Sequence, residues 1–170
     1  EIQTSSGAWS YAYFTVSENG VLVYRAGAAL AGSQLAWYDR SGKQTGVLGE
    51  PASYSDLQLS PDGKQAAVSV QAPGRQGSDI WIYDVPRNLK TRFTFDPADE
   101  LTLIWSPDGK RIAFVRKSYD ESLTHSSIWT VDVDGSNAEE LVRAPGQDLH
   151  QPRWSSDGSR ILLSTINLQR

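Results

Sequence analysis

Apolar and polar residues alternate over short stretches of this chain, and turn-forming residues bound each stretch. The clearest stretch runs from Leu103 to Val115 and reads LIWSPDGKRIAFV. Two alternating apolar runs flank Ser106-Pro107-Asp108-Gly109, in which proline presets φ and glycine accepts a positive φ. The pattern predicts a β-hairpin, and no segment shows a sustained helical period.

The same unit recurs along the chain. Its copies are marked by a serine before the turn, and these serines lie 43, 46 and 49 residues apart at Ser17, Ser60, Ser106 and Ser155. Each copy is followed by further short strands, and repeats of 40 to 50 residues with four strands each are typical of propeller blades. We therefore predict an all-β fold, a β-propeller of four-stranded antiparallel blades with about three and a half blades present.

This period divides the chain into an N-terminal tail and four repeats. Residues 1–10 are predicted to be a linker or the tail of a preceding element. Blades 1, 2 and 3 are predicted at 11–50, 51–97 and 98–146, and 147–170 supplies the first two strands of blade 4. We call these four segments repeats 1 to 4.

An incomplete ring would leave strand edges unpaired, and such edges favour association. If the chain is the whole protein, we expect it to form a homodimer through its two open ends. The alternative is that the missing blades belong to the same longer chain. The absence of methionine favours a processed or excised piece.

Composition narrows the classes of partner. A net charge of -4 argues against binding to nucleic acid, and no apolar run is long enough to predict membrane insertion. The chain has no cysteine, so disulfides, thiolate zinc sites and a cysteine nucleophile are excluded.

The repeats resemble the TolB-like, WD-repeat-like β-propeller family of bacteria. The resemblance rests on Trp105 to Gly109, on Ser60 to Gly63, and on Trp154 to Gly158. It extends to strands that end in aspartate, Ile80 to Asp84 and Ile128 to Asp132. A weaker copy of the turn reads Ser17 to Gly20. The resemblance implies the propeller fold and is nearly silent on activity.

A narrower resemblance concerns Leu35 to Gly42 (LAWYDRSG) and Phe93 to Glu100 (FTFDPADE). These phrases are similar to propellers on the C-terminal side of bacterial serine/threonine kinases and related envelope sensors. The resemblance implies the periplasm or the extracytoplasmic face as the location, with the cytoplasm as the alternative.

Two acidic patterns are predicted to be structural. An aspartate before the turn glycine normally bonds its own backbone, which is the role expected of Asp62, Asp108 and Asp157. Asp132 to Asn137 resembles the start of a calcium loop, but arginine stands at position 143, where a bidentate glutamate is required. We predict a turn there.

The two histidines do not form a local metal motif. His125 is predicted to lie in a polar loop, 116–127, that is exposed to solvent. His150 is placed just before the first strand of repeat 4, where it could line a channel.

Candidate binding residues are the charged residues of the loops on one side of the propeller, where long loops on a rigid scaffold favour recognition. The set is Asp96, Asp99, Glu100, Arg116, Lys117, Asp120, Glu121, Asp148 and His150. Their partner is predicted to be a protein or a small ligand, with no cofactor.

No nucleophile elbow or catalytic set is visible in the sequence. We therefore predict a protein that is not an enzyme, a propeller scaffold for protein interaction or ligand sensing. Two alternatives stay open. One is a lactonase-like hydrolase with a channel metal near Asp56 and His150. The other is the propeller gate of a peptidase whose catalytic domain is absent.

Overall fold

The computed structural model describes residues 14–16, 22–26, 32–72, 74, 77–119 and 124–167. Within these ranges every regular element is a β-strand, so the predicted all-β class is confirmed. The strands are β1 (Phe14–Val16), β2 (Leu22–Ala26), β3 (Ser33–Tyr38), β4 (Gln44–Leu59), β5 (Gln65–Gln71), β6 (Ser78–Asp84), β7 (Leu89–Arg92), β8 (Asp99–Trp105), β9 (Arg111–Tyr119), β10 (Thr124–Asp132), β11 (Glu139–Pro145), β12 (Gln147–Trp154) and β13 (Ile161–Asn167). In these residues no helix is long and apolar enough to cross a membrane.

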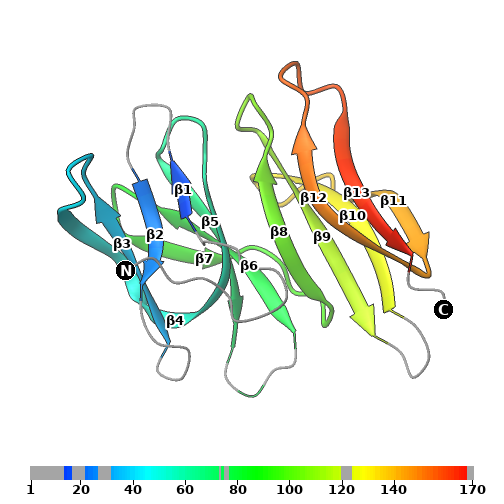
Figure 1. Cartoon of the computed structure of the whole chain (residues 1–170), viewed down its shortest axis with the longest axis horizontal. Coiled ribbons are helices and arrows are strands. Elements are labelled where there is room, and N and C mark those ends of the chain that lie inside the picture. Colours follow the sequence, from blue (N-terminus) through cyan, green and yellow to red (C-terminus); the bar gives the residue numbers. More distant parts are fainter. Residues whose placement is uncertain are drawn as a thin grey trace.

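All pairings between neighbouring strands are antiparallel, and they follow the order of the sequence. Strands β1 to β7 form one continuous sheet, β8 to β11 form a second, and β12 pairs with β13. Figure 1 shows the strands of repeats 1 and 2 on one side of the molecule and those of repeats 3 and 4 on the other. The first strands of repeats 2, 3 and 4 contact each other in turn, β4 with β8 and β8 with β12.

Strand β4 crosses the predicted boundary between repeats 1 and 2. Its first part pairs with β3 as far as Ala52, and its second part pairs with β5 from Ser53 onward. Gly49 lies within the first part, where the register with β3 shifts, and has φ of +64°, a conformation that glycine adopts without strain. One long strand therefore joins two repeats into a single sheet.

The predicted turns are confirmed in the three described copies. The turn glycines all have positive φ, at Gly63 (+70°), Gly109 (+68°) and Gly158 (+70°). In each copy the aspartate accepts hydrogen bonds from the turn serine and from a backbone N–H two residues on. These bonds lower the pKa of each aspartate.

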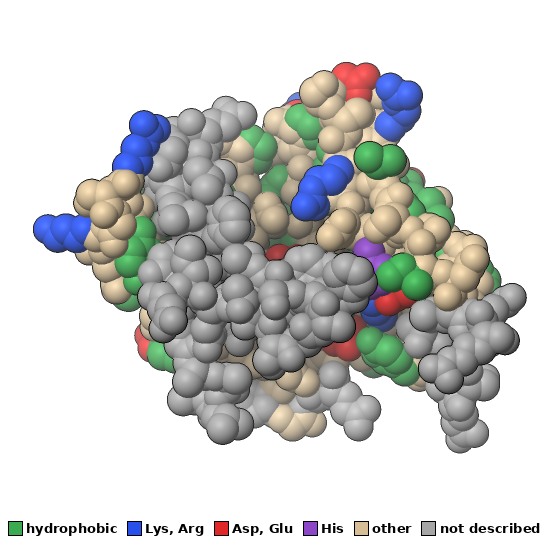
Figure 2. Space-filling view, viewed as in Figure 1, with side chains coloured by type: hydrophobic (Ala, Val, Ile, Leu, Met, Phe, Trp, Pro, Cys, Tyr) green, Lys and Arg blue, Asp and Glu red, His purple; other side chains and the backbone are tan. Residues whose placement is uncertain are grey.

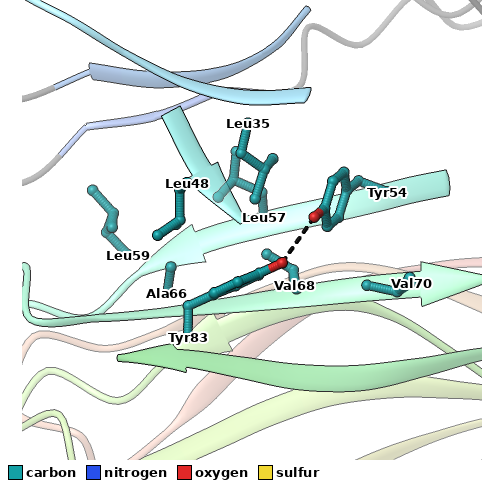
Figure 3. Close-up of a cluster of buried hydrophobic side chains, with 9 residues drawn as sticks. All are labelled: Leu35, Leu48, Tyr54, Leu57, Leu59, Ala66, Val68, Val70 and Tyr83. Carbon is teal, nitrogen blue, oxygen red and sulfur yellow. Dashed lines mark hydrogen bonds between the residues drawn. The ribbon is translucent and has the colours of Figure 1, made fainter. Parts of the chain in front are cut away.

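Three apolar clusters lie between the strands. The first, drawn in Figure 3, packs strands β3 to β6 and contains a hydrogen bond of 2.9 Å between the hydroxyls of Tyr54 and Tyr83. The second joins repeat 2 to repeat 3 through Ile80, Leu103 and Phe114 among others. The third is the smallest, with three buried residues, Val115, Ile128 and Leu149.

Some strand ends differ from prediction. The expected polar loop at 116–127 is mostly strand, because β9 continues to Tyr119 and β10 begins at Thr124. Lys117 pairs with Ser126 there. Backbone hydrogen bonds extend this hairpin whatever its side chains are, so polar residues did not reveal it. Strand β12 likewise begins at Gln147, four residues earlier than predicted.

Strand β7 ends early for a local reason. It spans only Leu89–Arg92. The backbone N–H groups of Phe93 and Thr94 both donate to the carbonyl of Ile80, and this takes the chain out of the regular ladder.

Candidate functional site

The structure brings the described candidate binding residues together on one side of repeats 2 to 4. Asp120 and Glu121 lie outside the described residues. The others come from the loop before β8, the start of β8, the end of β9 and the start of β12: Asp96, Asp99, Glu100, Arg116, Lys117, Asp148 and His150. All of them except Asp96 lie on strands rather than in the predicted loops.

Arg116 is the centre of one group. Its Nη1 lies 3.3 Å from Asp96 Oδ2, and its Nη2 lies 2.7 Å from Glu100 Oε1. Its guanidinium also lies 4.2 Å from the centre of the Trp129 ring, a cation–π distance. Charge and ring contacts fix Arg116 in one orientation.

Glu100 is the buried member of this group, with an exposed fraction of 0%. Burial raises its pKa, against the opposing effect of hydrogen bonds from Thr94 and Arg116. A ligand cannot reach this side chain directly. Any contribution of Glu100 to binding would have to act through Arg116.

Asp148 is the centre of the second group. Its Oδ1 lies 2.6 Å from Lys117 Nζ, and its Oδ2 lies 2.8 Å from His150 Nε2. Lys117 is on β9 and the other two are on β12, so this pairing crosses from repeat 3 to repeat 4. His150 is the more accessible partner, with 33% of its side chain exposed.

Asp99 links the two groups in space. Its Oδ1 accepts a hydrogen bond of 2.8 Å from the backbone N–H of Ser78. Tyr119 lies beside it and is 64% exposed. Partial burial of the phenol, together with the charges of Asp99 and Asp148, raises the pKa of Tyr119. Figure 2 shows a histidine side chain beside acidic and basic side chains on the face in view. A ligand can therefore reach four residues here: Asp96, with 36% of its side chain exposed, His150, with 33%, the partly exposed Asp99 and the exposed Tyr119.

The residues considered for a channel metal have other partners. Asp56 accepts hydrogen bonds of 2.7 Å from the backbone N–H groups of Leu57 and Leu103, and burial raises its pKa to about 6. His150 is paired with Asp148. In the described part of the chain, no group of three or more histidine or acidic side chains is placed to hold a metal ion.

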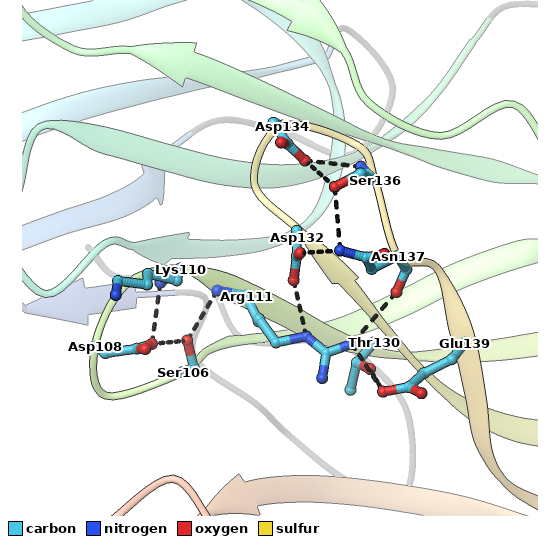
Figure 4. Close-up of polar contacts among 10 residues, drawn as sticks. All are labelled: Ser106, Asp108, Lys110, Arg111, Thr130, Asp132, Asp134, Ser136, Asn137 and Glu139. Carbon is cyan, nitrogen blue, oxygen red and sulfur yellow. Dashed lines mark hydrogen bonds and ion pairs between the residues drawn. The ribbon is translucent and has the colours of Figure 1, made fainter.

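The stretch that resembles a calcium loop is a turn, as predicted. Asp134 accepts two hydrogen bonds from Ser136, and Asn137 donates to Asp132 at 2.7 Å (Figure 4). Arg111 ties this turn to the neighbouring strands through ion pairs with Asp132, at 3.1 Å, and with Glu139, at 2.8 Å. His125, expected in a loop, lies on β10.

Sequence reasoning missed the bonds between repeats. Asp56 in repeat 2 accepts from Leu103 N in repeat 3, and the indole Nε1 of Trp105 donates to the carbonyl of Gln58 at 3.1 Å. These bonds join a side chain to the backbone of another repeat. The only available signal was the recurrence of tryptophan before the turn.

Comparisons with known proteins place the fold. No family model matches the chain. A TolB of Agrobacterium tumefaciens aligns over 99% of this chain and 59% of its own, with a TM-score of 0.76 and 21% identity. The acylaminoacyl peptidase of Pyrococcus horikoshii aligns over 88% of this chain and 27% of its own, with a TM-score of 0.61 and 15% identity. The fold is that of a TolB-like β-propeller.

A curated relative carries a peptidase name. "Uncharacterized peptidase YuxL" of Bacillus subtilis (strain 168) is 29% identical over 120 residues, which are 68% of this chain. The match covers 18% of YuxL, so this chain spans less than a fifth of the relative's length. The prediction that the protein is not an enzyme is contradicted, because this relative and several structural neighbours are peptidases, which indicates a relationship to enzymes. A propeller segment carries no catalytic motif from which that relationship could be seen.

Proposed function

We propose that this chain forms part of the β-propeller of a peptidase, and that the propeller contacts peptide substrates and limits their access to catalytic residues elsewhere in the protein. The match to YuxL over 120 residues carries the proposal. Structural similarity to a prolyl endopeptidase, with a TM-score of 0.65 at 18% identity, supports it. The similarity to TolB supports the propeller fold and does not favour one activity.

The charged face described above is the proposed contact surface for the peptide. Asp99 and His150 are accessible there, and both signs of charge are present within the same cluster. A peptide offers amide groups, an amine and a carboxylate, which such a mixed surface can bind. The kinase-linked context and the extracytoplasmic location stay predictions.

The test uses the full-length protein that contains this chain. Short peptide p-nitroanilides and casein serve as substrates, and we expect cleavage of the short peptides and little or no cleavage of casein. A full-length protein that cleaves no peptide would overturn the proposed function.

The contact surface is tested with the double variant D99N/H150A. We expect KM for the short peptides to rise severalfold with little change in kcat, because these side chains contact bound peptide rather than reacting atoms. K64A is the matched control, since Lys64 is exposed in a hairpin turn at the opposite end of the strands. An unchanged KM in the double variant would place the peptide on another face.

A further inference from the structure

Two side-chain hydrogen bonds, which we call latches, hold repeat 2 against repeat 3. The carboxylate of Asp56 accepts from Leu103 N at 2.7 Å, and Trp105 Nε1 donates to the carbonyl of Gln58 at 3.1 Å. Asp56 and Leu103 are far apart in sequence and lie on the first strands of adjacent repeats, β4 and β8. Repeat 2 therefore closes on repeat 3 through residues that lie one to four positions before the turn serines.

The same positions in the next pair of repeats cannot form the first latch. Counting back from the turn serines, Thr102 of repeat 3 stands where repeat 2 has Asp56, and Pro152 of repeat 4 stands where repeat 3 has Leu103. Threonine offers no carboxylate, and proline has no backbone N–H. The contact between β8 and β12 therefore lacks the carboxylate acceptor and the backbone N–H donor of the first latch.

The second latch is also missing there. Trp154 is the counterpart of Trp105, yet its indole Nε1 is buried and has no hydrogen-bond partner among the described residues. The Trp154 ring borders a groove of about 430 Å³ between the turns of repeats 3 and 4, which is also lined by Ser106, Asp108, Arg111 and Asp157. A buried N–H without an acceptor is costly, so this contact is incompletely closed.

The contacts that remain are fewer and lie near the other end of the strands. The backbone N–H of Leu149 donates to Ser126 Oγ at 3.2 Å, and Lys117 pairs with Asp148. The apolar cluster here has three buried residues, whereas the cluster between repeats 2 and 3 has eight. Figure 1 shows β12 and β13 as the last hairpin on the C-terminal side.

We propose that the hairpin β12–β13 opens away from β8 to β11 as a unit, while the contact between repeats 2 and 3 stays closed. Segments with few buried contacts and unpaired polar groups open at a lower free-energy cost than the rest of a fold. The end carrying Trp154 opens first, and the end carrying Lys117 and Asp148 acts as the hinge side. This inference does not depend on the proposed function.

Hydrogen exchange followed by mass spectrometry on the 170-residue chain is the first measurement. Loss of two latching hydrogen bonds predicts that amides of β12–β13 are protected roughly tenfold to a hundredfold less than those of β5 and β9. Equal protection in all of these strands would overturn the proposal.

A repair variant shows whether low protection of β12–β13 comes from the missing latch or from simple fraying of the hairpin. T102D/P152L restores the acceptor and the donor found between Asp56 and Leu103. We expect it to raise protection of β12–β13 about tenfold, with little effect from T102D or P152L alone, because each supplies half of the bond. Unchanged protection in the double variant would overturn the latch argument.

The tryptophan pair gives a second readout that does not require the repair variant to fold. W105F removes a bond that is made, so β8 should lose protection about fivefold, whereas W154F removes a buried N–H that has no partner. We expect W154F to leave protection of β12–β13 unchanged or slightly raised. A loss of protection in W154F as large as that in W105F would show that Trp154 is latched, contrary to the proposal.

Discussion

Acidification from pH 7 to pH 5 should stabilise this protein through Asp56. Burial raises the pKa of Asp56 to about 6, against the lowering effect of backbone N–H donors and of Arg153. The folded state therefore holds a proton that the unfolded chain releases near pH 3.8, its ordinary value. Stability from this group is fully present below the unfolded pKa and is lost as pH rises toward the folded pKa.

The magnitude follows from the two pKa values. The difference between 6 and 3.8 corresponds to about 3 kcal/mol over the whole range of titration. Most of it falls between pH 4 and pH 6, so about 1.3 kcal/mol is expected between pH 7 and pH 5. Glu100, whose pKa is also raised, acts in the same direction.

The assay is urea unfolding at pH 7 and pH 5, followed by tryptophan fluorescence, for the native protein and D56N. Asparagine cannot titrate, so the gain on acidification should be about 1.3 kcal/mol smaller in D56N. Changes due to the other titrating groups are common to both proteins and cancel. D62N is the control, because the pKa of the exposed Asp62 is lowered and this carboxylate stays ionised between pH 5 and pH 7.

One outcome would refute the reasoning. An equal gain in the native protein and D56N would show that the N–H donors of Leu57 and Leu103 outweigh burial, so that Asp56 does not titrate near pH 6.

Three further predictions concern the core and the open edge. Y54F should destabilise by about 2 kcal/mol, because it removes the bond to the Glu50 carbonyl and leaves the Tyr83 hydroxyl without its partner. Y83F should destabilise by about 1 kcal/mol, because Tyr54 still donates to the Glu50 carbonyl in that variant. Urea unfolding checks this order, and the reverse order would contradict it. G49A should destabilise by about 3 kcal/mol or more, since its Cβ would lie 2.1 Å from the Tyr83 hydroxyl oxygen; Y83F should not rescue it, because ring carbon Cζ would still be 2.5 Å away. The 170-residue chain should self-associate through β13, which pairs only with β12 in the described part; light scattering showing a monomer at micromolar concentration would refute this.

Local chemistry let the sequence predict much of the fold. The turn at Ser106 to Gly109 and its copies needs only aspartate and glycine in adjacent positions, preceded by proline in repeats 2 and 3, and the structure confirms the turns it describes. The all-β class followed from alternation, and the TolB-like resemblance agrees with the observed fold. The number of blades in the complete ring stays a prediction.

Turn chemistry and alternation could not show the relationship to peptidases, which the sequence analysis kept only as an alternative. No residue pattern of a propeller segment encodes the chemistry of another domain, so the expectation of no enzyme was drawn from an absence. Overall similarity to whole proteins corrected it. The nine candidate binding residues have no such test, and their role stays a proposal.

Tertiary structure alone decided how the repeats hold each other. The sequence shows Asp56, Thr102, Leu103 and Pro152 as unremarkable members of four strands. Only their placement on adjacent first strands reveals that one pair forms a bond of 2.7 Å and that the other pair cannot. Residues about 47 positions apart meet through the packing of whole repeats, and that packing depends on every side chain between them.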